Sequence, residues 1–79
     1  MAVVAQVEWR AEGRGAERPR ALLWGGERLE LVVEEAWVEG PEMAGEPVVR
    51  VFIVLDERGR ELRIRADSTG RVTTEQAME

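Results

Sequence analysis

The sequence contains no cysteine, histidine, lysine, tyrosine or asparagine. The absence of cysteine excludes disulfide bonds, thiolate nucleophiles and thiolate metal ligands together. Because histidine, lysine and tyrosine are also missing, acid–base or covalent catalysis would depend on carboxylates, threonines or the single serine, Ser68. The composition therefore predicts a protein that is not an enzyme.

The remaining reactive side chains have simple structural explanations. Ser68 lies in an Asp-Ser-Thr-Gly stretch at 67–70, where such a side chain bonds to neighbouring backbone amides in a turn. The glutamates at 34–35 and at 39 and 42 lack the spaced acidic loop that calcium sites use. We therefore expect no catalytic residue, no metal site and no cofactor.

The chain also lacks any long hydrophobic run, and no stretch approaches the roughly 20 apolar residues that a membrane-spanning helix needs. At 79 residues it is the size of one small domain, which we place at 1–79. The opening residues, MAVVAQVEWR, have no basic region followed by a cleavage-like site. The sequence thus predicts a cytoplasmic protein.

All 11 basic residues are arginine, against 16 acidic residues, and the net charge is −5. Arginine in place of lysine, dense charge and the scarcity of thermolabile amides favour a GC-rich, thermophilic source. The acidic residues gather in the first half of the chain, whereas residues 48–72 carry more arginine than acid. The protein is therefore acidic overall, with one mildly basic segment.

The stretch LELVVEEAWVEG, residues 29–40, fits both a helix and a strand. A helix would place an apolar stripe along one side, whereas a strand would place Leu29, Leu31 and Val33 on one face. The preceding Gly25-Gly26 pair, which lies between two apolar runs, is typical of a hairpin turn. A helix here would also lack a capping residue. We therefore predict a strand, with a bulge near Glu34–Glu35 that lets the apolar face resume at Ala36.

Most of the remaining chain also reads as strands joined by tight turns. Residues 3–10 alternate between apolar and polar, and so do residues 61–65. Turns ending in glycine are expected at 56–59 and 67–70, and loops at 11–19 and 40–47. About six short strands of this kind predict an all-β fold, a small antiparallel barrel or roll of the SH3-like or OB-like type.

The segment VVRVFIVL, residues 48–55, is the most apolar in the chain, and both of its faces are largely apolar. Such a strand is either central and covered on both sides, or it meets a second chain. We expect a protein-binding or adaptor module that can self-associate as a homodimer. The predicted contact surface consists of Trp24, Trp37, Phe52 and Val54, because tryptophan is enriched at interface centres.

The alternative function is binding of single-stranded nucleic acid. Small barrels often bind it, and Arg63, Arg65 and Arg71 would share one face of adjacent strands. The net charge of −5 and the interspersed Glu61 and Asp67 oppose this reading. Cross-strand ion pairs would explain the same arginines without a ligand.

Several turn and core residues form a recognisable pattern between residues 18 and 74. They are Arg20, Leu22, Trp24, Gly26, Val32, Val33, Trp37, Phe52, Gly59, Leu62, Ile64, Asp67 and Gly70. This pattern resembles an uncharacterised bacterial family of short β domains, often encoded near Y-family DNA polymerases. The resemblance implies a small β fold and a role beside DNA repair. The chain departs from the family at Val72, where an aromatic residue is usual, and in having no tyrosine.

Overall fold

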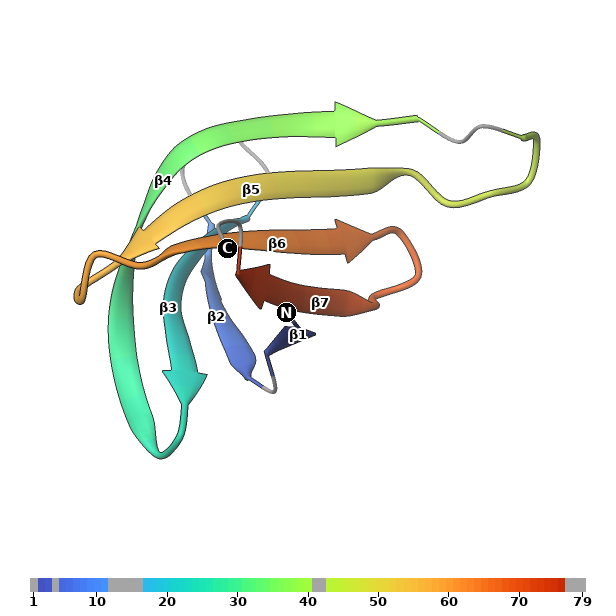
Figure 1. Cartoon of the computed structure of the whole chain (residues 1–79). Helices are drawn as coiled ribbons and strands as arrows, with labels where there is room; N and C mark the ends of the chain where they lie inside the picture. The colour runs from blue at the N-terminus through green and yellow to red at the C-terminus, as the bar shows by residue number, and fades with distance from the viewer. Residues whose placement is uncertain (1, 4, 12–16, 41–42, 77–79) are drawn as a thin grey trace.

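The structure, a computed structural model, describes residues 2–3, 5–11, 17–40 and 43–76. Seven strands lie in this described part of the chain. They are β1 (Ala2–Val3), β2 (Gln6–Arg10), β3 (Arg18–Trp24), β4 (Glu27–Glu39), β5 (Val49–Asp56), β6 (Glu61–Asp67) and β7 (Val72–Gln76). They form one antiparallel sheet in the order β1-β7-β6-β5-β4-β3-β2, which curls on itself (Figure 1). The predicted small antiparallel barrel or roll is confirmed.

From β2 to β7, neighbours in this sheet follow the chain order, so the fold is a meander rather than the Greek-key arrangement of OB-folds. The N-terminal segment, predicted as one strand, is divided between the two ends of the sheet. Its first piece, β1, pairs with β7, and its second piece, β2, pairs with β3. This division brings the last strand near the first and curls the sheet.

The stretch from residue 29 to 39 is a strand, as predicted. The hairpin before it is closed by the pair Trp24 and Glu27, and both Gly25 and Gly26 have positive φ. Two consecutive residues with positive φ fit a two-residue turn whose twist matches the flanking strands. The predicted bulge is also present, because the register against β5 shifts between Val33 and Glu35.

The turns that join β5 to β6 and β6 to β7 share one sequence pattern, Asp-x-x-Gly-Arg. In each, the aspartate carboxylate accepts hydrogen bonds from the amides two and four residues later, at 2.8 and 2.9 Å from Asp56 and at 2.9 and 3.0 Å from Asp67. Gly59 and Gly70 both have positive φ, as the turns predicted at these places require. Asp56 is buried beneath the Arg60 guanidinium, which donates to it at 2.8 Å.

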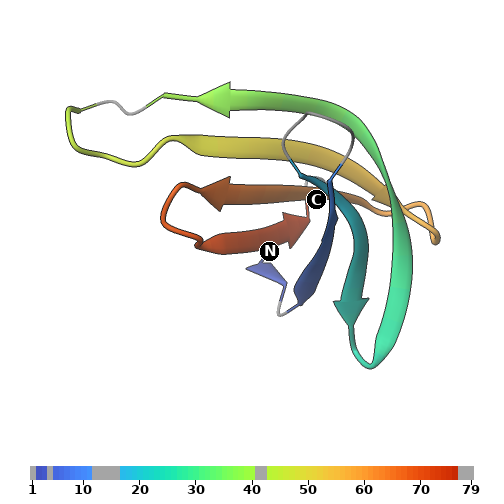
Figure 2. The same ribbon diagram turned by 180° about the vertical axis from the view of Figure 1, so that it is seen from behind.

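Figures 1 and 2 show the curled sheet from opposite directions. The core lies on its concave side. Its buried members come from three strands: Leu22, Phe52, Val54, Leu62 and Ile64. Trp9 packs edge-on against Phe52, with ring centroids 5.7 Å apart. Burying these aliphatic and aromatic groups supplies most of the stabilisation available to so short a chain.

The opposite face of β5 is also buried, although no second layer lies over it among the described residues. Val51 is fully buried and Ile53 nearly so. Their cross-strand neighbours are Trp37 on β4 and the arginines Arg63 and Arg65 on β6. Long arginine stems can cover apolar surface while their charged ends remain in water. The apolar strand is therefore central and covered on both sides, the first of the two predicted possibilities.

The structure gives no sign of a membrane-crossing helix: within the described ranges, none is long and apolar enough to span a bilayer.

Candidate functional site

Strand β4 is much longer than the part of β3 that pairs with it. It contains 13 residues, of which β3 pairs only with Glu27–Glu30. From Leu31 to Glu39 it pairs with β5 on one side, and no described strand pairs with the other side. Figure 1 shows this part of β4 as an outer border of the sheet. We call the unpaired side of Leu31–Glu39 the open edge.

Two hydrogen bonds donated by backbone amides show which groups the open edge presents. The Glu30 amide donates to the Glu57 carboxylate at 2.8 Å, so it points away from β3. The Asp56 amide donates to the Arg60 carbonyl at 3.0 Å, so Leu55, Ile53 and Val51 bond toward β4 instead. Because direction alternates along a strand, the open-edge donors and acceptors belong to Leu31, Val33, Ala36 and Val38.

An edge of this length, about 30 Å at the usual rise per residue, is a template for another strand. Proteins commonly blunt such edges with bulges and charges. Here one bulge and the adjacent glutamates Glu34 and Glu35 interrupt the edge near its middle. Apolar side chains nevertheless remain exposed along it, with Val32 at 65% and Val38 at 62%.

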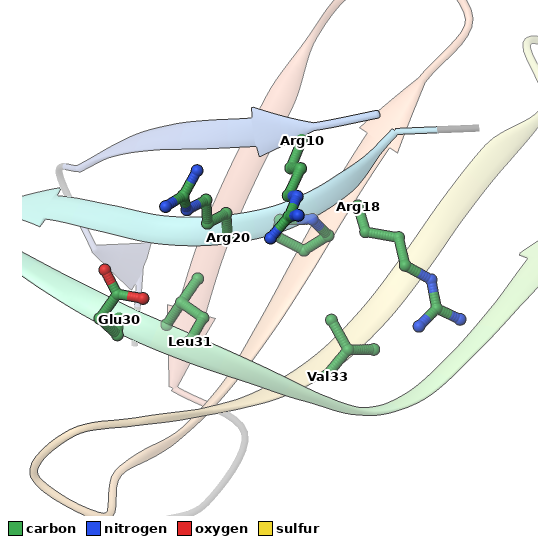
Figure 3. Close-up of a pocket in the computed structure, with 7 residues that line it drawn as sticks. Arg10, Arg18, Arg20, Glu30, Leu31 and Val33 are labelled. Carbon is green, nitrogen blue, oxygen red and sulfur yellow. The ribbon is translucent and has the colours of Figure 1, made fainter. Parts of the chain in front are cut away.

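At one end of the open edge, β3 separates from β4 and leaves a pocket of about 290 Å³, which we call the fork. It is lined by Arg10, Arg18, Pro19, Arg20, Glu30, Leu31 and Val33. In Figure 3, Leu31 and Val33 point from β4 toward β3. The same view shows Arg10 lying across β3 and Arg18 reaching toward β4 and β5. The fork therefore combines guanidinium groups with a half-buried apolar floor.

The fork gathers three arginines and one glutamate on an acidic protein. Arg10 and Arg18 stand directly opposite each other on β2 and β3. Like charges in this position are destabilising, and neither has an ion-pair partner among the described residues. Arg20 lies 4.0 Å from the Glu8 carboxylate.

Glu30, which lines the fork, and Glu8, which lies 4.0 Å from Arg20, are already engaged by Arg28. Its guanidinium donates to Glu8 at 2.8 and 3.1 Å, and it also contacts the Glu30 carboxylate. The Arg28 hydrogen bonds lower the pKa of Glu8, and they raise the pKa of Arg28 in turn. Glu8 and Glu30 therefore leave the charges of Arg10 and Arg18 largely uncompensated.

The structure does not bring the four predicted contact residues onto one surface. Phe52 and Val54 are 5% and 0% exposed and belong to the core, so they present no surface to a partner. Trp24 is half-buried, with the Arg60 guanidinium 4.3 Å above its ring. Trp37 lies on the opposite face of the sheet, beside Val51. The predicted patch is therefore wrong as a surface, because the sheet curls with Phe52 and Val54 inside.

The arginines of the predicted nucleic-acid face are partly paired. Arg63 contacts the Glu75 carboxylate at 3.3 Å, and Arg65 contacts Glu39 at 2.8 Å. The Trp37 indole and then Arg65 donate hydrogen bonds that lower the pKa of Glu39. Arg71 is exposed and has no ion-pair partner in the described ranges. The outer face therefore alternates positive and negative groups.

Sequence reasoning missed both the open edge and the fork. A signal for the fork existed, because Arg10 and Arg18 bracket the loop at 11–17 and a hairpin would place them opposite each other. The open edge begins where β3 stops pairing with β4, after the pair Ala21 and Glu30, although β3 itself continues to Arg18.

Comparison of the chain with protein-family models, curated proteins and solved structures finds no match. The resemblance noted from the sequence stays a prediction.

Proposed function

We propose that the protein is a non-enzymatic binding module that takes an extended segment of another protein as an additional strand on the open edge of β4. The observation that supports this proposal is the unpaired run from Leu31 to Glu39, which offers the backbone groups of four residues. In strand addition, main-chain hydrogen bonds provide affinity and alternate side chains provide specificity.

Charge favours a different protein over a second copy of this chain. The open edge carries Glu34, Glu35 and Glu39 and no basic residue. Two such edges in contact would bring like charges together, which weakens pairing. A partner segment with arginine or lysine would instead complement the edge. Self-association, expected from the sequence, becomes a competing outcome of the test.

Single-stranded nucleic acid is the less favoured ligand. Arg63 and Arg65 are engaged by carboxylates, and the net charge of −5 repels a polyanion at long range. A peptide strand with basic side chains is not repelled by the acidic edge in this way. We therefore take protein binding as the main proposal.

The proposal can be tested with Ala36→Pro and the matched control Ala36→Thr. Ala36 bonds toward the open edge, so proline there removes one open-edge donor without removing a bond to β5. Threonine at the same position keeps the donor. Both variants should fold, as judged by circular dichroism and thermal melting.

The probe is a random peptide library displayed twice, once with free C-termini and once with free N-termini. Selected peptides should bind the wild type and Ala36→Thr alike, and bind Ala36→Pro about tenfold more weakly or worse. They should also protect the amides of Leu31, Val33 and Val38 from hydrogen exchange.

Three results would overturn the proposal. One is that every selected peptide binds Ala36→Pro as well as it binds wild type. Another is that the protein alone sediments as a dimer that Ala36→Pro dissociates, which would assign the edge to a second copy. The last is that the library yields no binder while oligo(dT) binds with a steep salt dependence.

A further inference from the structure

We infer that the fork binds the C-terminal carboxylate of the partner segment, so that the module recognises free protein C-termini. This inference rests on the proposed strand addition along the open edge. Three features carry it: the direction of the added strand, the backbone of β3 at the end of the edge, and the unpaired charges of the fork.

Strand direction places a C-terminus at the fork. Every pairing in the sheet is antiparallel. A strand that continues this pattern would run from Glu39 toward Leu31, and its C-terminal end would therefore lie beside Leu31. The fork is lined by Leu31 and Val33, so it lies at that end of the edge.

The backbone of β3 limits how far the added strand can continue. Beyond Leu31, the same side of β4 is occupied, because Glu30 pairs with Ala21 on β3. A partner chain pairing as far as Leu31 would run into this strand. It must turn away or end there, and a chain end is the simpler fit for a fork of this size.

The charge of the fork suits a carboxylate. A carboxylate placed between Arg10 and Arg18 would relieve the repulsion of this cross-strand pair, which no described acidic group relieves. Guanidinium groups bind carboxylates through paired, charge-assisted hydrogen bonds. The carboxylates near the fork, on Glu8 and Glu30, are held by Arg28.

The walls of the fork also specify the residues near the partner's end. Leu31 and Val33 are half-buried, so they can still bury an apolar final side chain. Further along, Glu34 and Glu35 are exposed and have no ion pair among the described residues. The preferred partner therefore ends in an apolar residue and carries arginine or lysine a few residues earlier.

The first test compares forms of one peptide, N-acetylated Thr-Val-Arg-Val-Arg-Val-Thr-Leu, together with the peptides selected above. Each is prepared with a free carboxylate, with a C-terminal amide, and with a short Gly-Ser extension. The free carboxylate should bind about tenfold or more tightly than the other two. Titration calorimetry or fluorescence anisotropy measures the difference.

The second test uses Arg10→Gln and Arg18→Gln, with Arg71→Gln as the control of equal charge change. Each fork variant should weaken the carboxylate peptide about tenfold and leave the amide peptide nearly unaffected, whereas Arg71→Gln should change neither by more than about twofold. Because each fork variant removes one of two like charges, its melting temperature should stay the same or rise. A merely structural arginine would lower it.

The outcomes separate this inference from the proposed function. If amide and carboxylate forms bind equally but Ala36→Pro weakens both, strand addition stands and recognition of C-termini is wrong. If Ala36→Pro has no effect, both are wrong. A third result would assign the fork to phosphate and overturn the inference. In it, oligo(dT) competes with the peptide, and Arg10→Gln and Arg18→Gln weaken the binding of oligo(dT) rather than that of the carboxylate peptide.

Discussion

The two halves of β4 belong to one continuous strand but have different environments. From Glu27 to Glu30 the strand is paired with β3, and Leu29 packs inside at 5% exposure. From Leu31 to Glu39 it is paired with β5 alone, and Val38 is 62% exposed. The first half stabilises the curled sheet. The second half carries backbone groups that the described fold leaves unpaired.

The difference shows how so small a domain can combine stability with a binding surface. A chain of this length has one thin core, so few residues can be spared from it. Here the core uses the concave side of the sheet; Leu31 and Val33 of the open edge pack against it, whereas Val32 and Val38 remain exposed. Substitutions that change only the open-edge backbone groups of β4, such as Ala36→Pro, should therefore affect binding more than folding.

The largest difference in stability should be between proline substitutions at two adjacent positions, Ala36 and Trp37. Trp37 pairs with Val51 and bonds toward β5, so Trp37→Pro loses a ladder hydrogen bond, leaves its acceptor unsatisfied and removes the indole. It should lower the free energy of unfolding by about 3 kcal/mol or more. Ala36→Pro should cost less than about 1 kcal/mol, because its amide faces the open edge. Urea denaturation measures both. Equal losses would show that the assignment of the open-edge amides is wrong.

The next largest difference in stability should come from truncating an apolar side chain in each half of β4. Leu29→Ala should lower the free energy of unfolding by about 2–4 kcal/mol, since it leaves a cavity in the packed half. Val38→Ala should change it by less than about 0.5 kcal/mol. A comparable loss at Val38 would mean that the second half of β4 is covered in solution.

The turn at residues 56–59, between β5 and β6, should make the free energy of unfolding depend on pH through Asp56. Burial alone would raise the pKa of Asp56, but hydrogen bonds from the Arg60 amide and guanidinium and from the Arg58 amide lower it below its usual value. A lowered pKa stabilises the fold fully above the ordinary value of about 3.9, and this stabilisation is lost as pH falls toward the folded-state pKa.

Asp56→Asn should therefore cost about 1–3 kcal/mol at neutral pH, and its deficit relative to wild type should shrink below about pH 4. Asp67→Asn, in the matching but exposed turn, should cost less. Denaturation curves collected across this pH range check both variants. If the loss of unfolding free energy caused by Asp56→Asn does not change with pH, the charge of the Asp56 carboxylate does not stabilise the fold.

A smaller effect is expected on the outer face. Trp37→Thr keeps the backbone amide but uncovers part of Val51, so it should cost about 1 kcal/mol. It also serves as the side-chain control for Trp37→Pro. Thermal melting of the two variants together separates the side chain from the amide, and equal losses would assign the whole effect to the indole.

The sequence predicted the local features of the fold because local residues determine them. The Gly25-Gly26 turn, the bulge near Glu34 and the two Asp-x-x-Gly turns each depend on a few neighbouring positions. The orientation of β5 was not predictable in this way. Both of its faces are apolar, and only the direction of curl decides that Phe52 and Val54 lie inside.

The candidate site was even less accessible to sequence reasoning. The open edge depends on where β3 leaves β4, which is a property of three strands together rather than of any one segment. The register of β2 against β3 also shifts between Glu8 and Trp9, where Trp9 lies opposite Pro19.

Hydrogen exchange of the β4 amides in the isolated protein, followed by NMR, tests the open edge most directly. The amides of Leu31, Val33, Ala36 and Val38 should exchange on the order of 100-fold faster than those of Val32, Trp37 and Glu39, whose bonds run to β5. Protection at alternate residues is the expected result. Equal protection of both sets would show that the edge is already occupied, and would contradict the proposed binding site.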